Sequence, residues 1–245
     1  MVQLDVFDFL LNNLSIGKNM NKEEIIKKTE DFVKKAFLED FTGHDYWHTQ
    51  RVRFLANKIA CDEGADLFEV DMAALLHDVG DYKFFNGDER AGLLLVKQWL
   101  SSLEISNDLQ KKILNIISQV SFKNTLSESG SIKNKEFAQI PSKELMSVCD
   151  ADRLDAMGAI GIARAFAYGG FYKREIYNPK IPPKRNITQE QYKTTEAPSI
   201  NHFYEKLLKL KNMIYTKLGK KIAKKRHRFL NLYLKEFFKE WKGKM

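Results

Sequence analysis

The sequence predicts an all-α protein, a single helical bundle that ends in a basic pair of helices. Three observations support this class. Apolar residues recur at the helical spacing of three or four along nearly the whole chain, and no run alternates as a strand would. With 245 residues and 44% hydrophobic content, the chain can bury a substantial core. No internal repeat or clean linker interrupts it, so we expect one domain over residues 1–245.

Capping residues delimit the first helices. A helix is expected over roughly 21–39, before Gly43 breaks the pattern. The next helix stops at Gly64, and Asp66 is a suitable N-cap for the one that follows and ends just before Gly80. Further helices are expected at roughly 88–103, 107–120, 142–167, 200–218 and 220–241.

Cysteine usage and charge limit the functional classes. Cys61 and Cys149 lie in apolar helical surroundings without CxxC spacing, which predicts buried free thiols and a reducing, cytoplasmic location. The N-terminus carries no signal-peptide pattern, and no apolar run is long enough to span a membrane.

The net charge is +8, yet residues 201–245 hold 14 Lys or Arg against 3 Glu, a local excess of +11. The basicity therefore belongs to the C-terminal helices.

Metal-ligand residue types gather in three segments. His48 begins one helix, and His77 with Asp78 ends the next. The third segment, "VCDADRLDAMGAIG" at 148–161, supplies Asp150, Asp152 and Asp155. A divalent ion bound by nitrogen and oxygen needs imidazoles and carboxylates that converge from separate elements. The three segments together predict such a site.

Two His-Asp dipeptides compete for this role, His44-Asp45 and His77-Asp78. Adjacent side chains diverge by about 100° in mid-helix, but at a helix C-terminus both can turn toward one ion. The second pair has that placement, whereas the first follows a glycine in a loop before a helix. We therefore assign the metal to the second pair.

The ordered motifs "HDYWHTQRV", "LLHDVGDYK" and "DADRLDAMGAIGIARAF" resemble the HD-domain metal-dependent phosphohydrolases, and within them the YedJ/YpgQ-like branch. The resemblance covers most of the chain from about residue 40, with a motif core at roughly 40–167 and C-terminal helices at roughly 200–241. It implies one divalent ion, expected to be Mn²⁺, with Mg²⁺, Co²⁺, Ni²⁺, Fe²⁺ or Zn²⁺ as alternatives. The four ligands that it implies are His48, His77, Asp78 and Asp152.

The resemblance also suggests residues that act on the substrate. Asp81, three residues after Asp78, matches an acid proposed to handle the proton of the attacking water, although it could merely cap a turn. His44 is placed near the substrate and not on the metal. Lys83 and Lys123 lie near the motifs and are candidate phosphate-binding residues, with a solvated surface as the simpler interpretation.

The predicted function is hydrolysis of a nucleotide or another small phosphate ester, by analogy a (deoxy)nucleoside triphosphate cleaved to monophosphate and pyrophosphate. A phosphodiesterase or a 5′-nucleotidase on the same ligand set remains an alternative. A second alternative is a protein that binds nucleic acid or an acidic partner through its basic tail. Nucleic acid is not the expected partner, because the tail aromatics, including Phe229 and Trp241, have the spacing of core residues. The oligomeric state is left open.

Overall fold

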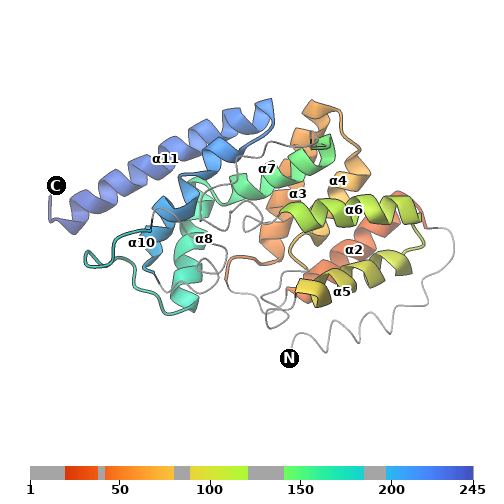
Figure 1. Cartoon of the computed structure of the whole chain (residues 1–245), viewed down its shortest axis with the longest axis horizontal. Coiled ribbons are helices and arrows are strands. Elements are labelled where there is room, and N and C mark those ends of the chain that lie inside the picture. The colour runs from red at the N-terminus through yellow and green to blue at the C-terminus, as the bar shows by residue number, and fades with distance from the viewer. Residues whose placement is uncertain (1–19, 38–41, 80–88, 121–140, 185–196, 245) are drawn as a thin grey trace. The chain divides into compact units, whose positions relative to one another are not determined.

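The computed structural model describes residues 20–37, 42–79, 89–120, 141–184 and 197–244, and every regular element in these ranges is helical (Figure 1). The all-α prediction is confirmed. The described helices form two compact units, whose boundary falls after Val148 within one helix. The expectation of a single domain over residues 1–245 stays a prediction.

The first unit contains helices α2 to α6 and the first turns of α7, and α4 is enclosed by α2, α3 and α6. Eight of the ten residues of α4 are buried, so the helix is apolar on nearly every side. A second packing centre joins α2 to α5, where the Trp99 ring stacks on Phe32 and its Nε1 donates to Thr29. The bounds are α2 Lys22–Ala36, α3 Tyr46–Glu63, α4 Leu67–Leu76, α5 Glu89–Ser102, α6 Asn107–Val120 and α7 Lys143–Asp155.

The turn between α3 and α4 follows the capping residues seen in the sequence. Gly64 closes α3 in the left-handed conformation, at φ 67°, where a side chain would be strained. The Asp66 carboxylate then accepts from the backbone N–H groups of Phe68 and Glu69 and starts α4. Both predicted helix ends are confirmed. The two helices form an antiparallel hairpin whose open end carries three of the four candidate ligands, His48, His77 and Asp78.

The second unit contains the rest of α7 and the helices that follow it. One continuous helix was expected over 142–167, and this prediction is wrong. The chain breaks after Asp155 and restarts at Gly158, whose φ of 74° is disfavoured for other residues. The Arg226 side chain comes within 3.1 Å of the position that a β-carbon of Gly158 would take, so the break is also a close approach of two segments. Helix α8 spans Gly158–Phe171.

The helix expected over 200–218 is also divided. It is replaced by α10 (Ser199–His202), the π-helix η3 (Phe203–Leu207) and the 3₁₀-helix η4 (Leu210–Met213). The chain then leaves the helical conformation because the buried Asp150 carboxylate accepts from the backbone N–H groups of Tyr215 and Thr216. Thr216 caps the last helix, α11, at Lys217–Trp241, close to the predicted 220–241.

Two further expectations, both about which side chains are buried, are wrong in part. Cys61 is exposed, because it lies on the outward side of α3, whereas Cys149 is buried, and neither cysteine forms a disulfide. Phe229 and Trp241 are 47% and 51% exposed, so they are not core residues, whereas Leu230 and Leu234 of the same helix are buried. The helical spacing was correct, but the buried stripe of α11 is narrower than predicted.

Among the described residues, no helix has the length and apolar character of a membrane span.

Candidate metal centre

The N-terminus of α3 explains the first His-Asp dipeptide. Asp45 is the N-cap of this helix, and its Oδ1 accepts from the backbone N–H of His48 at 2.8 Å. The His44 ring stands edge-on to the His48 ring, with centroids 5.7 Å apart. The first pair therefore serves the helix that carries a candidate ligand, and the Asp45 carboxylate is engaged in capping.

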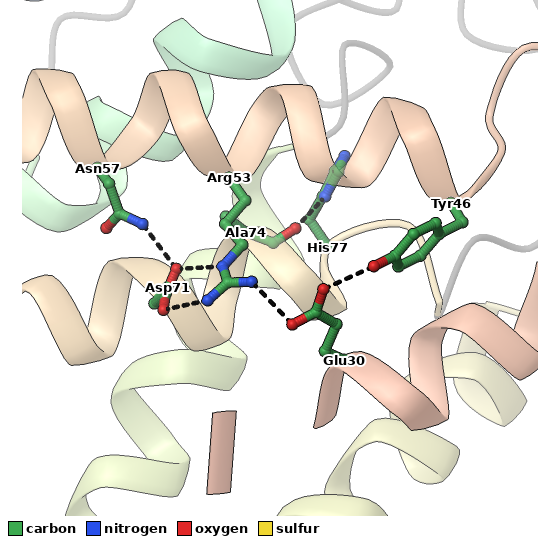
Figure 2. Close-up of polar contacts among 7 residues, drawn as sticks. All are labelled: Glu30, Tyr46, Arg53, Asn57, Asp71, Ala74 and His77. Carbon is green, nitrogen blue, oxygen red and sulfur yellow. Dashed lines mark hydrogen bonds and ion pairs between the residues drawn. The ribbon is translucent and has the colours of Figure 1, made fainter. Parts of the chain in front are cut away.

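The C-terminus of α4 supplies the second pair. His77 follows the last helical residue directly, and its Nδ1 lies 2.8 Å from the carbonyl oxygen of Ala74 (Figure 2). Because that oxygen can only accept, the contact requires the proton on Nδ1 and leaves Nε2 as the lone-pair donor of a neutral ring. The fold thus selects the tautomer that a metal ligand needs.

The two imidazoles meet at the Asp78 carboxylate. His48 Nε2 lies 3.2 Å from one carboxylate oxygen of Asp78, and His77 Nε2 lies 3.4 Å from the other. The ligand atoms of the three residues all fall within 4.8 Å of one another. Both histidines are buried, and the Asp78 side chain is 15% exposed. The resemblance to the HD-domain phosphohydrolases implied that His48, His77 and Asp78 share a site, and in the structure the three residues lie together.

Charge in the cluster favours an ionised Asp78. Burial opposes ionisation, but in the protonated imidazoles the charge of His77, the hydrogen bond and charge of His48, and the charge of His44 hold the pKa of Asp78 well below its usual value. Asp78 is thus ready to ligate a cation as a carboxylate. A divalent ion bound by these residues would take the place of the positive charge that the protonated imidazoles supply.

The acids of α7 divide between structural and candidate roles. Asp150 accepts three hydrogen bonds from Tyr215 and Thr216, and burial, only partly opposed by these bonds, raises its pKa. Asp155 makes a buried ion pair with Arg164, at 3.0 Å. Asp152 lies between them on the same helix and is partly buried. It belongs to the second unit, while the other three predicted ligands belong to the first, so its role as fourth ligand stays a prediction.

The remaining candidate residues, Asp81, Lys83 and Lys123, lie outside the described residues, and their roles stay predictions. Sequence reasoning missed two features of the site. One is the capping role of Asp45, which the motif Asp-x-x-His just before a helix could have indicated. The other is the ion pair of Arg53 with Asp71, between α3 and α4. These residues come from separate helices, and no local pattern pairs them.

Two imidazoles and a carboxylate form a donor set suited to a first-row divalent cation, so the residues fit a catalytic metal centre in a helical protein. The family model described as the HD domain matches residues 46–157, which include all four predicted ligands. The protein YpgQ of Bacillus subtilis is 32% identical over 212 residues, covering 86% of this chain and 91% of its own length.

Solved structures extend this similarity to most of the fold. An HD-superfamily hydrolase from Bacillus thuringiensis superposes with a TM-score of 0.67 at 41% identity, covering 91% of this chain and 99% of its own. YpgQ of B. subtilis in complex with ADP gives a TM-score of 0.65 at 28% identity, covering 88% and 97%. The chain belongs to the HD-domain family and is a metal-dependent phosphohydrolase of that family.

Proposed function

We propose that this chain hydrolyses nucleoside triphosphates, with deoxynucleotides included, to a nucleoside monophosphate and pyrophosphate. The observation that carries the proposal is the meeting of His48, His77 and Asp78 within 4.8 Å. That donor set suits phosphoryl chemistry assisted by one divalent ion, which we expect to be Mn²⁺. The structure of the relative YpgQ in complex with ADP favours a nucleotide over other phosphate esters.

The reaction adds water to the α-phosphorus, breaks the bond to the bridging oxygen and releases pyrophosphate. A divalent cation held by His48, His77 and Asp78, with Asp152 as the proposed fourth ligand, would polarise a phosphoryl oxygen and lower the pKa of water. The Ala74 carbonyl keeps the His77 tautomer. Asp81 is proposed to accept the proton of the attacking water, and Lys83 and Lys123 to contact the phosphates.

A nucleotide panel tests the proposal. Purified protein is incubated with a deoxynucleoside triphosphate, a nucleoside monophosphate or a cyclic nucleotide, each with Mn²⁺, Mg²⁺, Co²⁺ or Zn²⁺ in turn. Release of pyrophosphate from the triphosphate is the expected result. Phosphate released from the monophosphate would indicate a 5′-nucleotidase, and opening of the cyclic nucleotide a phosphodiesterase. Either outcome without pyrophosphate release would overturn the proposed reaction.

Matched variants assign the activity to the candidate site. Asp78→Ala removes a proposed ligand. Asp71→Ala is not a suitable control, because Asp71 is itself buried in the same unit. Glu69→Gln is the better control, since Glu69 lies on the same helix and pairs with Lys112 at the surface. Activity should be lost in Asp78→Ala and retained in Glu69→Gln. If Asp78→Ala kept as much activity as Glu69→Gln, the reaction would not take place at this site.

A further inference from the structure

We infer that the ion pair between Arg53 and Asp71 is a positioning device for the metal centre, setting the rotation of α4 against α3 so that His77 and Asp78 face His48. The inference rests on the proposed metal site at these three residues. It assigns to the pair a role in metal affinity that is separate from any contribution to stability.

The ion pair of Arg53 with Asp71 is a bidentate contact. Arg53 Nε and Nη2 donate to the two carboxylate oxygens of Asp71, at 2.6 and 3.0 Å, so the guanidinium and carboxylate lie fork to fork (Figure 2). Asn57, one turn after Arg53 on α3, donates to the same carboxylate at 2.6 Å. Asp71 thus receives three hydrogen bonds, all from one face of α3. Such a set restrains rotation and translation of α4 together.

A second carboxylate ties the same face of α3 to α2. Glu30 accepts from Arg53 Nη1 at 3.2 Å and from the Tyr46 hydroxyl at 2.6 Å (Figure 2). Burial, with the hydrogen bond and charge of Glu30, raises the pKa of Tyr46 to about 12, so the phenol remains a donor. Helix α3 is therefore held along two turns, from Tyr46 beside the ligand His48 to Arg53.

Apolar packing by itself specifies the rotation of α4 poorly. Seven of its eight buried residues are apolar, and Asp71 is the only charged residue among the eight. A helix that is apolar on every side can turn within its packing at modest cost, whereas a buried carboxylate must keep its partners. In some proteins, a buried polar group selects one register among several apolar alternatives. Asp71 has the placement for this role.

The distances connect the pair to the ligands. Arg53 follows His48 by five residues and His77 follows Asp71 by six, which is about 7.5 Å and 9 Å along the two helices. In the antiparallel hairpin, the pair thus lies between the closed end at Gly64 and the open end at the cluster. Metal ligation tolerates errors of about 0.2 Å in ligand distances. A rotation of α4 that the hairpin turn alone permits would therefore displace the ligand atoms of His77 and Asp78.

The decisive variant removes both charges together. In Arg53→Met with Asp71→Leu, apolar side chains replace the pair, which often leaves stability equal or higher, while Asn57 and Glu30 each lose one hydrogen bond. The rotation of α4 is then less well specified. We expect the melting temperature to change little while the dissociation constant for Mn²⁺, measured by calorimetric titration of metal alone, rises about 10- to 100-fold, the range for lost outer-shell support. The visible spectrum of bound Co²⁺ should change, because ligand geometry changes.

Two further variants keep the test independent of folding. Arg53→Lys retains the charge but loses the fork, and Asn57→Ala removes one hydrogen bond while leaving the ion pair, so their affinities should fall between those of the wild type and the double variant. Thr29→Val is the matched control. It removes the buried hydrogen bond from Trp99, which joins α2 to α5 and not α3 to α4. This control should lose stability and keep its metal affinity.

The outcomes separate the two proposals. A double variant that binds Mn²⁺ with wild-type affinity and gives the wild-type Co²⁺ spectrum would overturn the positioning role and leave the metal site intact. An equal loss of affinity in Thr29→Val would also overturn it, because any destabilisation would then suffice. A wild-type protein that binds neither ion would overturn the positioning role together with the proposed function.

Discussion

Replacing Asp45 by Ala tests how strongly the metal centre depends on the cap of α3. The Asp45 carboxylate accepts from the backbone N–H of His48 at 2.8 Å, so the cap restrains the very residue that carries a candidate ligand. Loss of an N-cap costs about 1 kcal/mol of helix stability. Since 1.4 kcal/mol is tenfold in an equilibrium constant, the first turn of α3 would fray about fivefold more often.

The affinity of the Asp45→Ala variant for metal should fall by about fivefold at most. The dissociation constant rises by about fivefold where the first turn is mostly frayed before metal binds, and by less where packing already keeps the turn ordered. The assay is calorimetric titration of Mn²⁺ at a temperature where every variant is folded, together with a thermal melt. A chain of this length should lose about 2–4 °C in melting temperature per kcal/mol.

Asp66→Ala is the matched control for this experiment. Asp66 is the N-cap of α4 and accepts from two backbone N–H groups, but His77 lies at the opposite end of that helix. The control should lose similar stability and keep its metal affinity. If both variants bound Mn²⁺ like the wild type, or if Asp66→Ala lost as much affinity as Asp45→Ala, local capping would not control the position of His48.

Three other predictions concern the ligands, the base and the helix break. Asp78→Ala should purify without metal by elemental analysis and His44→Ala with it, and the reverse result would move the site to the first His-Asp pair. Asp81→Asn should keep metal and lose about 10²- to 10⁴-fold in turnover, whereas wild-type turnover would remove Asp81 from the mechanism. Gly158→Ala should lower the free energy of unfolding by about 1–2 kcal/mol in denaturant titrations, while Gly170→Ala, with open space around it, should not destabilise.

Local patterns predicted those parts of the structure that neighbouring residues control. The end of α3 at Gly64 and the start of α4 at Asp66 follow from backbone conformation and capping within a few residues. The assignment of His77 and Asp78 to one cluster followed from the placement of a dipeptide at a helix end. The helical spacing of α11 was also correct. In each case the determining interaction spans no more than a few positions in the chain.

Errors arose where a distant segment overrides the local preference. The sequence around Gly158 predicts a continuous helix, but the helix is broken there because Arg226, 68 positions away in the sequence, packs against Gly158. The helix expected through residue 218 stops because Asp150 binds the backbone at Tyr215 and Thr216. Helical periodicity predicts an apolar side of a helix but not how much of it a neighbour covers, and for this reason Phe229 was wrongly placed in the core.

The sequence by itself determined the class of the protein, because helical periodicity, caps and the ordered His and Asp motifs are local signals that survive without a partner. Only the tertiary structure decided how the candidate ligands are held. Packing of α3 on α4 brings the Nε2 atoms of His48 and His77 onto Asp78, and the Ala74 carbonyl selects the tautomer of His77. The pairing of Arg53 with Asp71 likewise exists only when two helices meet. The physical reason is that hydrogen bonds and charge interactions act over a few ångströms in space, whatever the separation in the chain.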